Sequence, residues 1–454
     1  MAKPQTERNQ PALTNPDPPA LAPRPSILSN PSAHKALQII ILAAIYSPIS
    51  WLSLTPVYGS VPSALYHHQG KVVASLVGFL GRKQLQKLLP SNIVRWLPAF
   101  AFWIPTIQFI LFKYSSNLGV PYGPALTELF TYYPLTLLSL FTAGSFLDEV
   151  DFSGLGSTIA EHGPSLGTYF VFTTIERIAN SIMLRNIGSN FFLSRIGLQL
   201  TIAIIYALAI PRAVLWPVIP SMVFTMMYNV HTPLQRSTNV LNSTLQLQNF
   251  TLIDRQESIT GYISVLDNTA AQYRVMRCDH SLLGGEWTIP SRKGRKPPRA
   301  QEPIYAIFVM LEAVRLAETE DGQPRVDSKS TALNIGLGIG TAPGALIAHG
   351  INTTVVELDP VVYDFAVKYF GLPSNHTPII GDAVHLVDDA KARNLSTKYD
   401  YIIHDVFTGG AEPVELFTQE FLSGLEYLLK EDGVIAIVGS PLLNFYLPLY
   451  FESS

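Results

Sequence analysis

The sequence predicts a multi-span α-helical membrane region, followed by a small β domain and a doubly wound α/β domain. Three observations support this prediction. Only 14% of the 454 residues are charged, whereas soluble domains carry roughly 25%. Long uncharged apolar runs occupy the first half of the chain, and the last third alternates Val- and Ile-rich strands with helices, a pattern typical of a parallel sheet covered on both faces.

The first 35 residues predict a disordered tail. They contain eight prolines, scattered polar residues and no apolar periodicity, a composition that cannot bury a core. The first apolar run begins only at Ala36 and has no small-residue cleavage pattern, so a secretory signal is not expected.

Residues 36–232 form the predicted transmembrane region, with five to seven spans. Lipid bilayers require about 20 apolar residues per helical span. The runs at 196–211 and 213–230 are divided by Arg212, and they predict either two short spans or one interrupted helix. The strongest runs cover 36–58, 96–112 and 129–147, and the weaker ones cover 72–80 and 165–184.

Charged residues lie within or beside these runs, namely Glu128, Glu176, Arg177 and Arg185. Charges inside a membrane are expensive and often mark a transport pathway. The alternative is that each lies at an interface or pairs with a neighbour, as Glu176 and Arg177 could. The loop that contains Lys71 to Arg95 is basic, which places it in the cytosol by the positive-inside rule.

Residues 233–295 predict a small β domain. Apolar residues alternate in 243–253, 261–267 and 272–278, and Gly284-Gly285 predicts a tight turn after them. Cys278 is the single cysteine, so an intramolecular disulfide and a Cys-rich metal site are excluded; we interpret it as a strand residue. A basic loop follows, and residues 303–318 predict an amphipathic helix.

The last section, residues 296–454, predicts five parallel strands at 332–337, 353–360, 377–384, 398–407 and 433–439. Gly336, Gly338 and Gly340 lie between the first strand and its helix, where a ligand can approach the backbone. Glu357 ends the second strand, where its carboxylate can accept hydrogen bonds from ribose hydroxyls. This combination predicts a nucleoside site, but the glycine spacing departs from G-x-G-x-x-G and disfavours NAD.

Two further acids follow strands at the ligand-binding edge expected for such a sheet. Asp382 is placed to bind the amino group of an adenine, and Asp405 to face a second substrate; either acid could instead cap the turn that follows it. His404 adjoins Asp405, but strand alternation points it to the opposite face, so we interpret it as a core or surface residue.

These residues resemble the spermidine/spermine synthase family of aminopropyltransferases, within the larger S-adenosylmethionine-dependent, class I methyltransferase-like Rossmann fold. The resemblance covers about residues 255–440. It implies S-adenosylmethionine or its decarboxylated form as substrate, no metal, and an amine or other small acceptor. By resemblance, Glu357 binds ribose, Asp382 and Ala383 lie at the adenine, Asp405 is the first catalytic acid and Tyr305 the substrate-lid tyrosine. Multi-span proteins with such a C-terminal domain exist.

Several positions depart from that family. Ile339 stands where the family carries the acid that binds the aminopropyl amine, Thr408 where it carries the second catalytic acid, and Ala306-Ile307 where it carries a polar pair. The main functional prediction is aminopropyl transfer to an amine. The alternatives are methyl transfer from S-adenosylmethionine, and a non-catalytic transporter or sensor that binds a nucleoside or polyamine.

The remaining expectations concern the chain end and the cell. The chain stops shortly after the fifth strand, which predicts a C-terminally incomplete α/β domain from a truncated or mis-spliced product. We expect a multi-pass protein with a cytosolic catalytic domain, and therefore unmodified sequons. A net charge of -3 supplies no basic field for nucleic acid. The sequence does not determine the oligomeric state.

Overall fold

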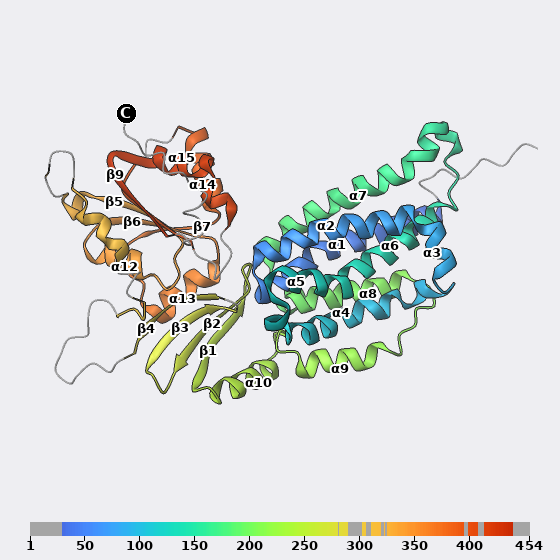
Figure 1. Cartoon of the computed structure of the whole chain (residues 1–454), viewed down its shortest axis with the longest axis horizontal. Helices are drawn as coiled ribbons and strands as arrows, with labels where there is room; N and C mark the ends of the chain where they lie inside the picture. The colour runs from blue at the N-terminus through green and yellow to red at the C-terminus, as the bar shows by residue number, and fades with distance from the viewer. Residues whose placement is uncertain are drawn as a thin grey trace, which may run out of the picture.

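The computed structural model describes residues 30–279, 281–288, 302–305, 310–318, 322, 325–394, 398–406 and 413–438. The predicted disordered tail and the end of the chain therefore lie outside the described residues, apart from residues 30–35. Figure 1 shows an elongated molecule in which a helical region and an α/β domain lie at opposite ends, with a second, smaller sheet between them.

The helical region separates the predicted runs into distinct helices. The two runs around Arg212 are two helices, because the chain reverses there and Arg212 takes a φ of 55°. Residues 115–130 are also helical, which the sequence pattern did not predict, and this segment is kinked at Gly119, where φ is 68°. The helices are α1 (Pro31–Tyr58), α2 (Ser60–Leu80), α3 (Arg82–Leu88), α4 (Leu97–Phe112), α5 (Ser115–Phe130), α6 (Tyr132–Leu147), α7 (Ser157–Asn186), α8 (Arg195–Ala209) and α9 (Val218–Tyr228).

Two of these segments are long and apolar enough to cross a bilayer, Pro31–Tyr58 and Ile93–Phe112, within the part of the chain that the structure describes. This is fewer than the five to seven spans predicted. Helices of this kind also form the cores of soluble proteins, and most of the first segment is buried. One reason for the difference is that α6, α8 and α9 contain 16, 15 and 11 residues, fewer than the roughly 20 that a span requires.

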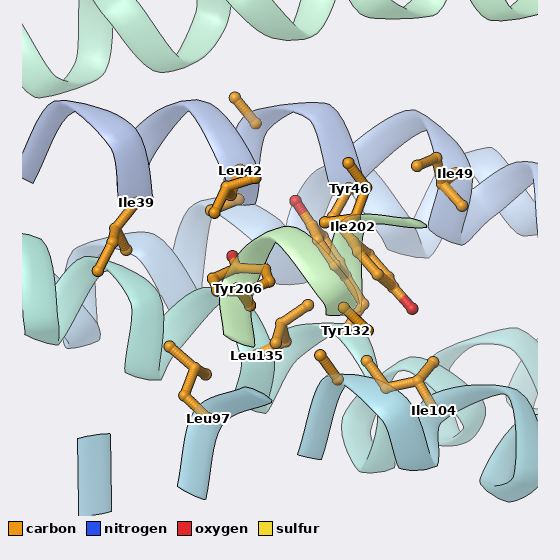
Figure 2. Packing of buried hydrophobic residues seen from close by; sticks show 14 of the residues in the cluster. Ile39, Leu42, Tyr46, Ile49, Leu97, Ile104, Tyr132, Leu135, Ile202 and Tyr206 are labelled. Carbon is orange, nitrogen blue, oxygen red and sulfur yellow. The ribbon is translucent and has the colours of Figure 1, made fainter. Parts of the chain in front are cut away.

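The core of the helical region forms around α1. Its stacked aromatic pair, Tyr46 and Tyr132, has ring centroids 6.1 Å apart, and both side chains are fully buried. Burying such side chains contributes several kcal/mol in total, at about 25 cal/mol per Å² of apolar surface. Figure 2 shows Ile39, Leu42, Tyr46 and Ile49 of α1 together with Leu97 and Ile104 of α4, Tyr132 and Leu135 of α6, and Ile202 and Tyr206 of α8.

The small β domain is an antiparallel sheet in the order β1-β2-β3-β4. Residues 243–246, predicted as strand, instead end helix α10 (Gln235–Gln246), because Ser237, Leu241 and Leu245 fall on one helical face that is at least partly buried. The strands are β1 (Phe250–Glu257), β2 (Tyr262–Asn268), β3 (Tyr273–Cys278) and β4 (Ser281–Trp287).

The predicted Gly284-Gly285 turn is wrong, since both glycines lie inside β4. Gly284 takes a φ of 136°, and a Cβ there would lie 3.0 Å from Ile339 Cγ1. The glycine therefore permits close packing against the next domain. Cys278 is a buried strand residue, as predicted. Of the predicted helix at 303–318, residues 306–309 lie outside the described part and Leu311–Leu316 is a 3-10 helix.

The α/β domain confirms the predicted doubly wound, Rossmann-like fold. Its five strands are all parallel, in the order β7-β6-β5-β8-β9, so the order reverses between β5 and β8. The strands are β5 (Thr331–Ile335), β6 (Asn352–Glu357), β7 (Thr377–Ile380), β8 (Tyr399–Asp405) and β9 (Leu429–Val438), and the helices are α12 (Thr341–Ala348), α13 (Pro360–Phe370), α14 (Ala383–Ala392) and α15 (Gln419–Leu428).

A buried ion pair joins the helical region to the β domain. Arg195 at the start of α8 lies 2.9 Å from Glu257 Oε1 at the end of β1, and both side chains are at least 96% buried. The Arg195 guanidinium also donates to the carbonyl oxygen of Leu52 in α1 at 2.6 Å. The loop between β1 and β2 is thus held against two helices.

Candidate functional site

The glycine loop between β5 and α12 forms the floor of the candidate site. Gly336, Gly338 and Gly340 take φ angles of 83°, 55° and 88°, values that glycine adopts without strain. A Cβ on Gly338 would lie 2.5 Å from the Leu283 carbonyl oxygen of β4. The predicted glycines therefore serve both the sharp turn and the close approach of the β domain.

Gly336 gives a direct test of this loop. A Cβ at this position would overlap the carbonyl oxygen of Asp405 at the end of β8, and its positive φ adds strain to any other residue. We expect Gly336→Ala to destabilise the chain by about 1–3 kcal/mol and to weaken nucleoside binding. Thermal unfolding and calorimetric binding measure both effects. Gly350→Ala, also at positive φ but with open space around it, should leave nucleoside binding intact; an equal loss of binding in both variants would contradict the role of the close contact.

Glu357 ends β6 directly beside this loop. Its Oε2 accepts a hydrogen bond from the Leu337 backbone N–H at 2.9 Å, and its Oε1 accepts one from the Asp359 N–H at 2.8 Å. Burial raises the pKa of the carboxyl to about 7, against the opposing effect of the backbone donors. The structure thus brings the predicted ribose acid and the glycine loop together.

Asp359, two residues further, connects this acid to the β1–β2 loop. Its carboxylate accepts from the Ser258 hydroxyl at 2.6 Å and the Thr260 hydroxyl at 2.5 Å, and it caps α13 by accepting from the Val361 N–H at 2.9 Å. The side chain is fully buried. Sequence reasoning missed this role, although an acid followed by Pro360 at a helix start is a recognisable capping signal.

Asp405 lies at the end of β8, beside the first glycine of the loop. Burial raises the pKa of its carboxyl to about 6. The adjacent His404 points away, into the core against the rings of Phe417 and Phe421, and burial lowers the pKa of its imidazole to about 4. The prediction that His404 occupies the opposite face is confirmed, and it is a neutral core residue.

The remaining predicted residues lie around this centre. Asp382 is exposed and caps α14 by accepting from the Val384 N–H at 2.9 Å; the buried Ala383 begins that helix. The preceding Gly381 donates to the Glu357 carbonyl oxygen at 2.8 Å, so the loop after β7 adjoins the acid. Tyr305 is half exposed beyond β4. Thr408 and Ala306-Ile307 lie outside the described residues.

Ile339, the first position that departs from the aminopropyltransferase pattern, is buried where the glycine loop contacts β4. It packs in an apolar cluster with Ile263, Met276 and Leu337, and it faces Gly284. A carboxylate would be costly in these surroundings without a partner. The apolar residue is therefore part of the domain contact. Among the described residues, no group of three or more His, Cys, Asp or Glu side chains could hold a metal ion.

Glu286 on β4 is a titratable group that the sequence pattern did not single out. It is buried, and burial raises the pKa of its carboxyl to about 7, although the nearby Arg274 lowers it. The signal available in the sequence was an acid within an otherwise apolar strand, two residues after Gly284.

Comparison with known proteins assigns the family. The chain is 48% identical over 421 residues to the N-terminal histidine N-methyltransferase of Emericella nidulans, which covers 92% of this chain and 75% of that protein. The chain belongs to the family of this methyltransferase. Residues 325–447 match the spermine/spermidine synthase domain. The polyamine aminopropyltransferase of Vibrio vulnificus is 39% identical over 107 residues, which is 35% of its length.

Solved structures match more weakly. A spermidine synthase in complex with the transition state analogue AdoDATO is 21% identical with a TM-score of 0.31, and it covers 40% of this chain and 56% of its own. Human methyltransferase-like protein 13 in complex with SAH is 20% identical with a TM-score of 0.24, and it covers 31% of this chain and 64% of its own. The chain thus spans less than two thirds of each of these proteins.

The family relationship settles part of the functional prediction. The resemblance to the spermidine synthase domain is confirmed for the domain, whereas the relative that covers most of this chain is a methyltransferase. The predicted substrate class, S-adenosylmethionine or its decarboxylated form, is confirmed by this relationship. Methyl transfer, which the sequence left as the alternative, is better supported than aminopropyl transfer and a role in polyamine synthesis.

Proposed function

We propose that the protein transfers a methyl group from S-adenosylmethionine to a nitrogen of a histidine at the N-terminus of a protein. The observation that carries the proposal is the 48% identity to the N-terminal histidine N-methyltransferase over nearly the whole chain. The apolar Ile339 argues in addition against aminopropyl transfer, because the position that it occupies carries, by resemblance, the acid that binds the charged amine in the aminopropyltransferase family.

The chemistry requires little beyond positioning. The lone pair of the histidine nitrogen attacks the methyl carbon bound to the sulfonium. The carbon–sulfur bond breaks with its electron pair moving to sulfur, which leaves S-adenosylhomocysteine. The surplus proton on the methylated imidazole passes to a base, a role that we assign to Asp405. Holding both reactants in line supplies most of the acceleration, since the sulfonium is already an activated leaving group.

An assay with defined acceptors tests the proposal. The purified chain, S-adenosylmethionine and a peptide that begins with histidine should give a peptide with one added methyl group, detected by mass spectrometry. A peptide with the histidine at the second position should not react. Aminopropyl transfer from the decarboxylated nucleoside to putrescine, without methylation of the peptide, would overturn the proposal in favour of the polyamine reaction.

The role of Asp405 gives a separate prediction. We expect Asp405→Asn to lower the rate of methyl transfer by about 10²–10⁴-fold, the usual contribution of a general base, while S-adenosylmethionine affinity is retained. Because the pKa of Asp405 is raised to about 6 and a base must be unprotonated, the wild-type rate should fall as the pH drops below about 6. Rate and calorimetric affinity, measured on the same preparations, check this. Unchanged turnover in the variant would remove Asp405 from the chemistry, whereas the absence of turnover in wild type would favour a non-catalytic sensor.

We also propose that the helical region lies in a lipid bilayer. Large apolar side chains face outward on several helices, such as Phe170 on α7, Leu208 on α8 and Ile219 on α9, each at least 66% exposed. Polar side chains such as Gln199 are buried inside. This distribution suits a helix bundle in lipid. Retention of the chain in membranes after an alkaline carbonate wash tests it, and release into the wash would contradict it.

The α/β domain is proposed to face the cytosol, which supplies S-adenosylmethionine. A glycosidase-sensitive shift of the chain on a gel would instead place the domain and its sequons in a lumen.

A further inference from the structure

A chain of polar side chains crosses the interior of the helical region. His67 of α2 and Glu128 of α5 form its inner part, with His67 Nδ1 2.6 Å from Glu128 Oε1 and both side chains at least 99% buried. Lys71 of α2 and Glu176 of α7 form its outer part at 2.5 Å, with side chains 12% and 17% exposed. The Glu176–Arg177 pairing considered from the sequence is therefore replaced by a partner on another helix.

The Ser47 hydroxyl of α1 connects the two parts. Its oxygen lies 2.8 Å from His67 Nε2, and it donates its single hydrogen to Glu176 Oε1. A hydroxyl has only one hydrogen to donate. The hydrogen bond between Ser47 and His67 must therefore use a hydrogen on His67 Nε2. The contact between His67 Nδ1 and Glu128 needs a second hydrogen. One surplus proton is therefore shared between the imidazole and the Glu128 carboxyl.

The charges require the same proton. Without it, the cluster holds one cation, Lys71, and two carboxylates, Glu128 and Glu176. An uncompensated charge in a buried site is strongly destabilising. One proton on the His67–Glu128 pair makes the cluster neutral.

Other titratable groups in the described part of the chain lie against this cluster. His68 lies 3.4 Å from the Lys71 amine, Tyr132 stacks on His67 with ring centroids 4.9 Å apart, and Tyr133 donates to the Tyr66 carbonyl oxygen. The Ser50 hydroxyl donates to Glu128 Oε1 at 2.9 Å. Two buried oxygens at the pair have no hydrogen-bond partner, namely Glu128 Oε2 and the hydroxyl oxygen of Tyr132, whose ring stacks on His67.

We propose that His67 and Glu128 form a proton-binding site inside the helical region, and that the Ser47 hydroxyl links it to Glu176 and Lys71. When the proton leaves, Glu128 remains a carboxylate that accepts from His67 Nδ1–H, and the Ser47 hydroxyl turns to donate to the freed Nε2. The departing proton passes from Nε2 to the Ser47 oxygen while the original Ser47 hydrogen moves to Glu176, which releases it to the outside.

The order hydroxyl, imidazole and carboxylate is also that of hydrolase triads. Ser47 is fully buried, and its hydrogen is donated to Glu176 rather than to the imidazole. The arrangement therefore suits a proton relay and not an attacking nucleophile. It is independent of methyl transfer, because every group in it lies in the helical region.

Proton counting on the purified full-length chain in detergent tests the site. Wild type should release one more proton per chain than Glu128→Gln on titration from mildly acidic to alkaline pH, because the amide keeps the cluster neutral without the surplus proton. Glu161→Gln, an exposed acid at the start of the same helix as Glu176, should retain the wild-type count. Equal counts for wild type and Glu128→Gln would overturn the proposal.

Ser47→Ala tests the connection without removing the pair. Infrared difference spectra after a pH jump should show the imidazole and carboxyl signals of the pair changing at least tenfold more slowly in this variant than in wild type. An unchanged rate would remove Ser47 from the route. If Glu128→Gln does not fold, the comparison is made with His67→Gln. The wild-type spectra should then show an imidazole or carboxyl change that His67→Gln lacks, and the same spectra in both proteins would overturn the site.

Discussion

Replacement of Glu357 by alanine is expected to weaken the binding of S-adenosylmethionine by about 10–100-fold. Hydrogen bonds to a charged group contribute roughly 1.5–3 kcal/mol, and each 1.4 kcal/mol is about a factor of ten in affinity. The alanine variant also removes the acceptor of the Leu337 and Asp359 backbone N–H groups, so the glycine loop loses its support. Titration calorimetry on the full chain measures the effect.

The pH dependence of binding distinguishes the carboxylate from a merely structural side chain. The pKa of Glu357 is raised to about 7 in the free protein, and hydroxyl donors of a ribose favour the ionised form. Affinity should therefore fall as the pH drops below about 7, because binding must then release a proton. In Glu357→Gln this dependence should vanish, while the exposed Glu426→Ala should behave as wild type. A pH-independent wild-type affinity would show that the carboxyl does not hold the ribose.

The second large effect is expected at the contact between the helical region and the β domain. Arg195→Met should lower the free energy of unfolding by about 3–5 kcal/mol, the usual result of leaving one partner of a buried ion pair uncompensated. Three further acceptors lose their donor, namely Leu52, Thr55 and Ile259. Thermal unfolding followed by near-ultraviolet circular dichroism should show a midpoint several degrees lower.

The double variant Arg195→Met/Glu257→Gln provides the control for this prediction. Removing both charges leaves no buried unpaired ion, so much of the stability should return and the two substitutions should be strongly non-additive. Arg274→Met, whose partner Asp267 is a quarter exposed, should cost about 1 kcal/mol or less. Equal losses for the two arginines would contradict a special role for the buried pair. The β1–β2 loop also contacts Asp359 beside the nucleoside site, so Arg195→Met should weaken nucleoside binding as well.

The sequence by itself determined the α/β domain. Strand periodicity, the glycines after the first strand and an acid at the end of the second depend on local backbone geometry and on the parallel order of strands. Glu357, Gly336 and Asp405 therefore lie together as predicted. The replacement of the family's acid by Ile339 was also visible in the sequence. It already favoured methyl transfer, the alternative that the family relationship supports. The assignments of Tyr305, Asp382 and Ala383 to substrate remain predictions.

Only the tertiary structure decided how the parts contact each other. The Gly284-Gly285 pair resembled a turn, but it lies in a strand that packs closely against Ile339. A local sequence pattern does not indicate contacts between residues that are so far apart in the sequence. The partners of Glu128 and Glu176 likewise come from other helices. Charge pairing acts over a few ångströms in space and is indifferent to separation along the chain, so His67, Ser47 and Lys71 were found only when the helices had been packed together.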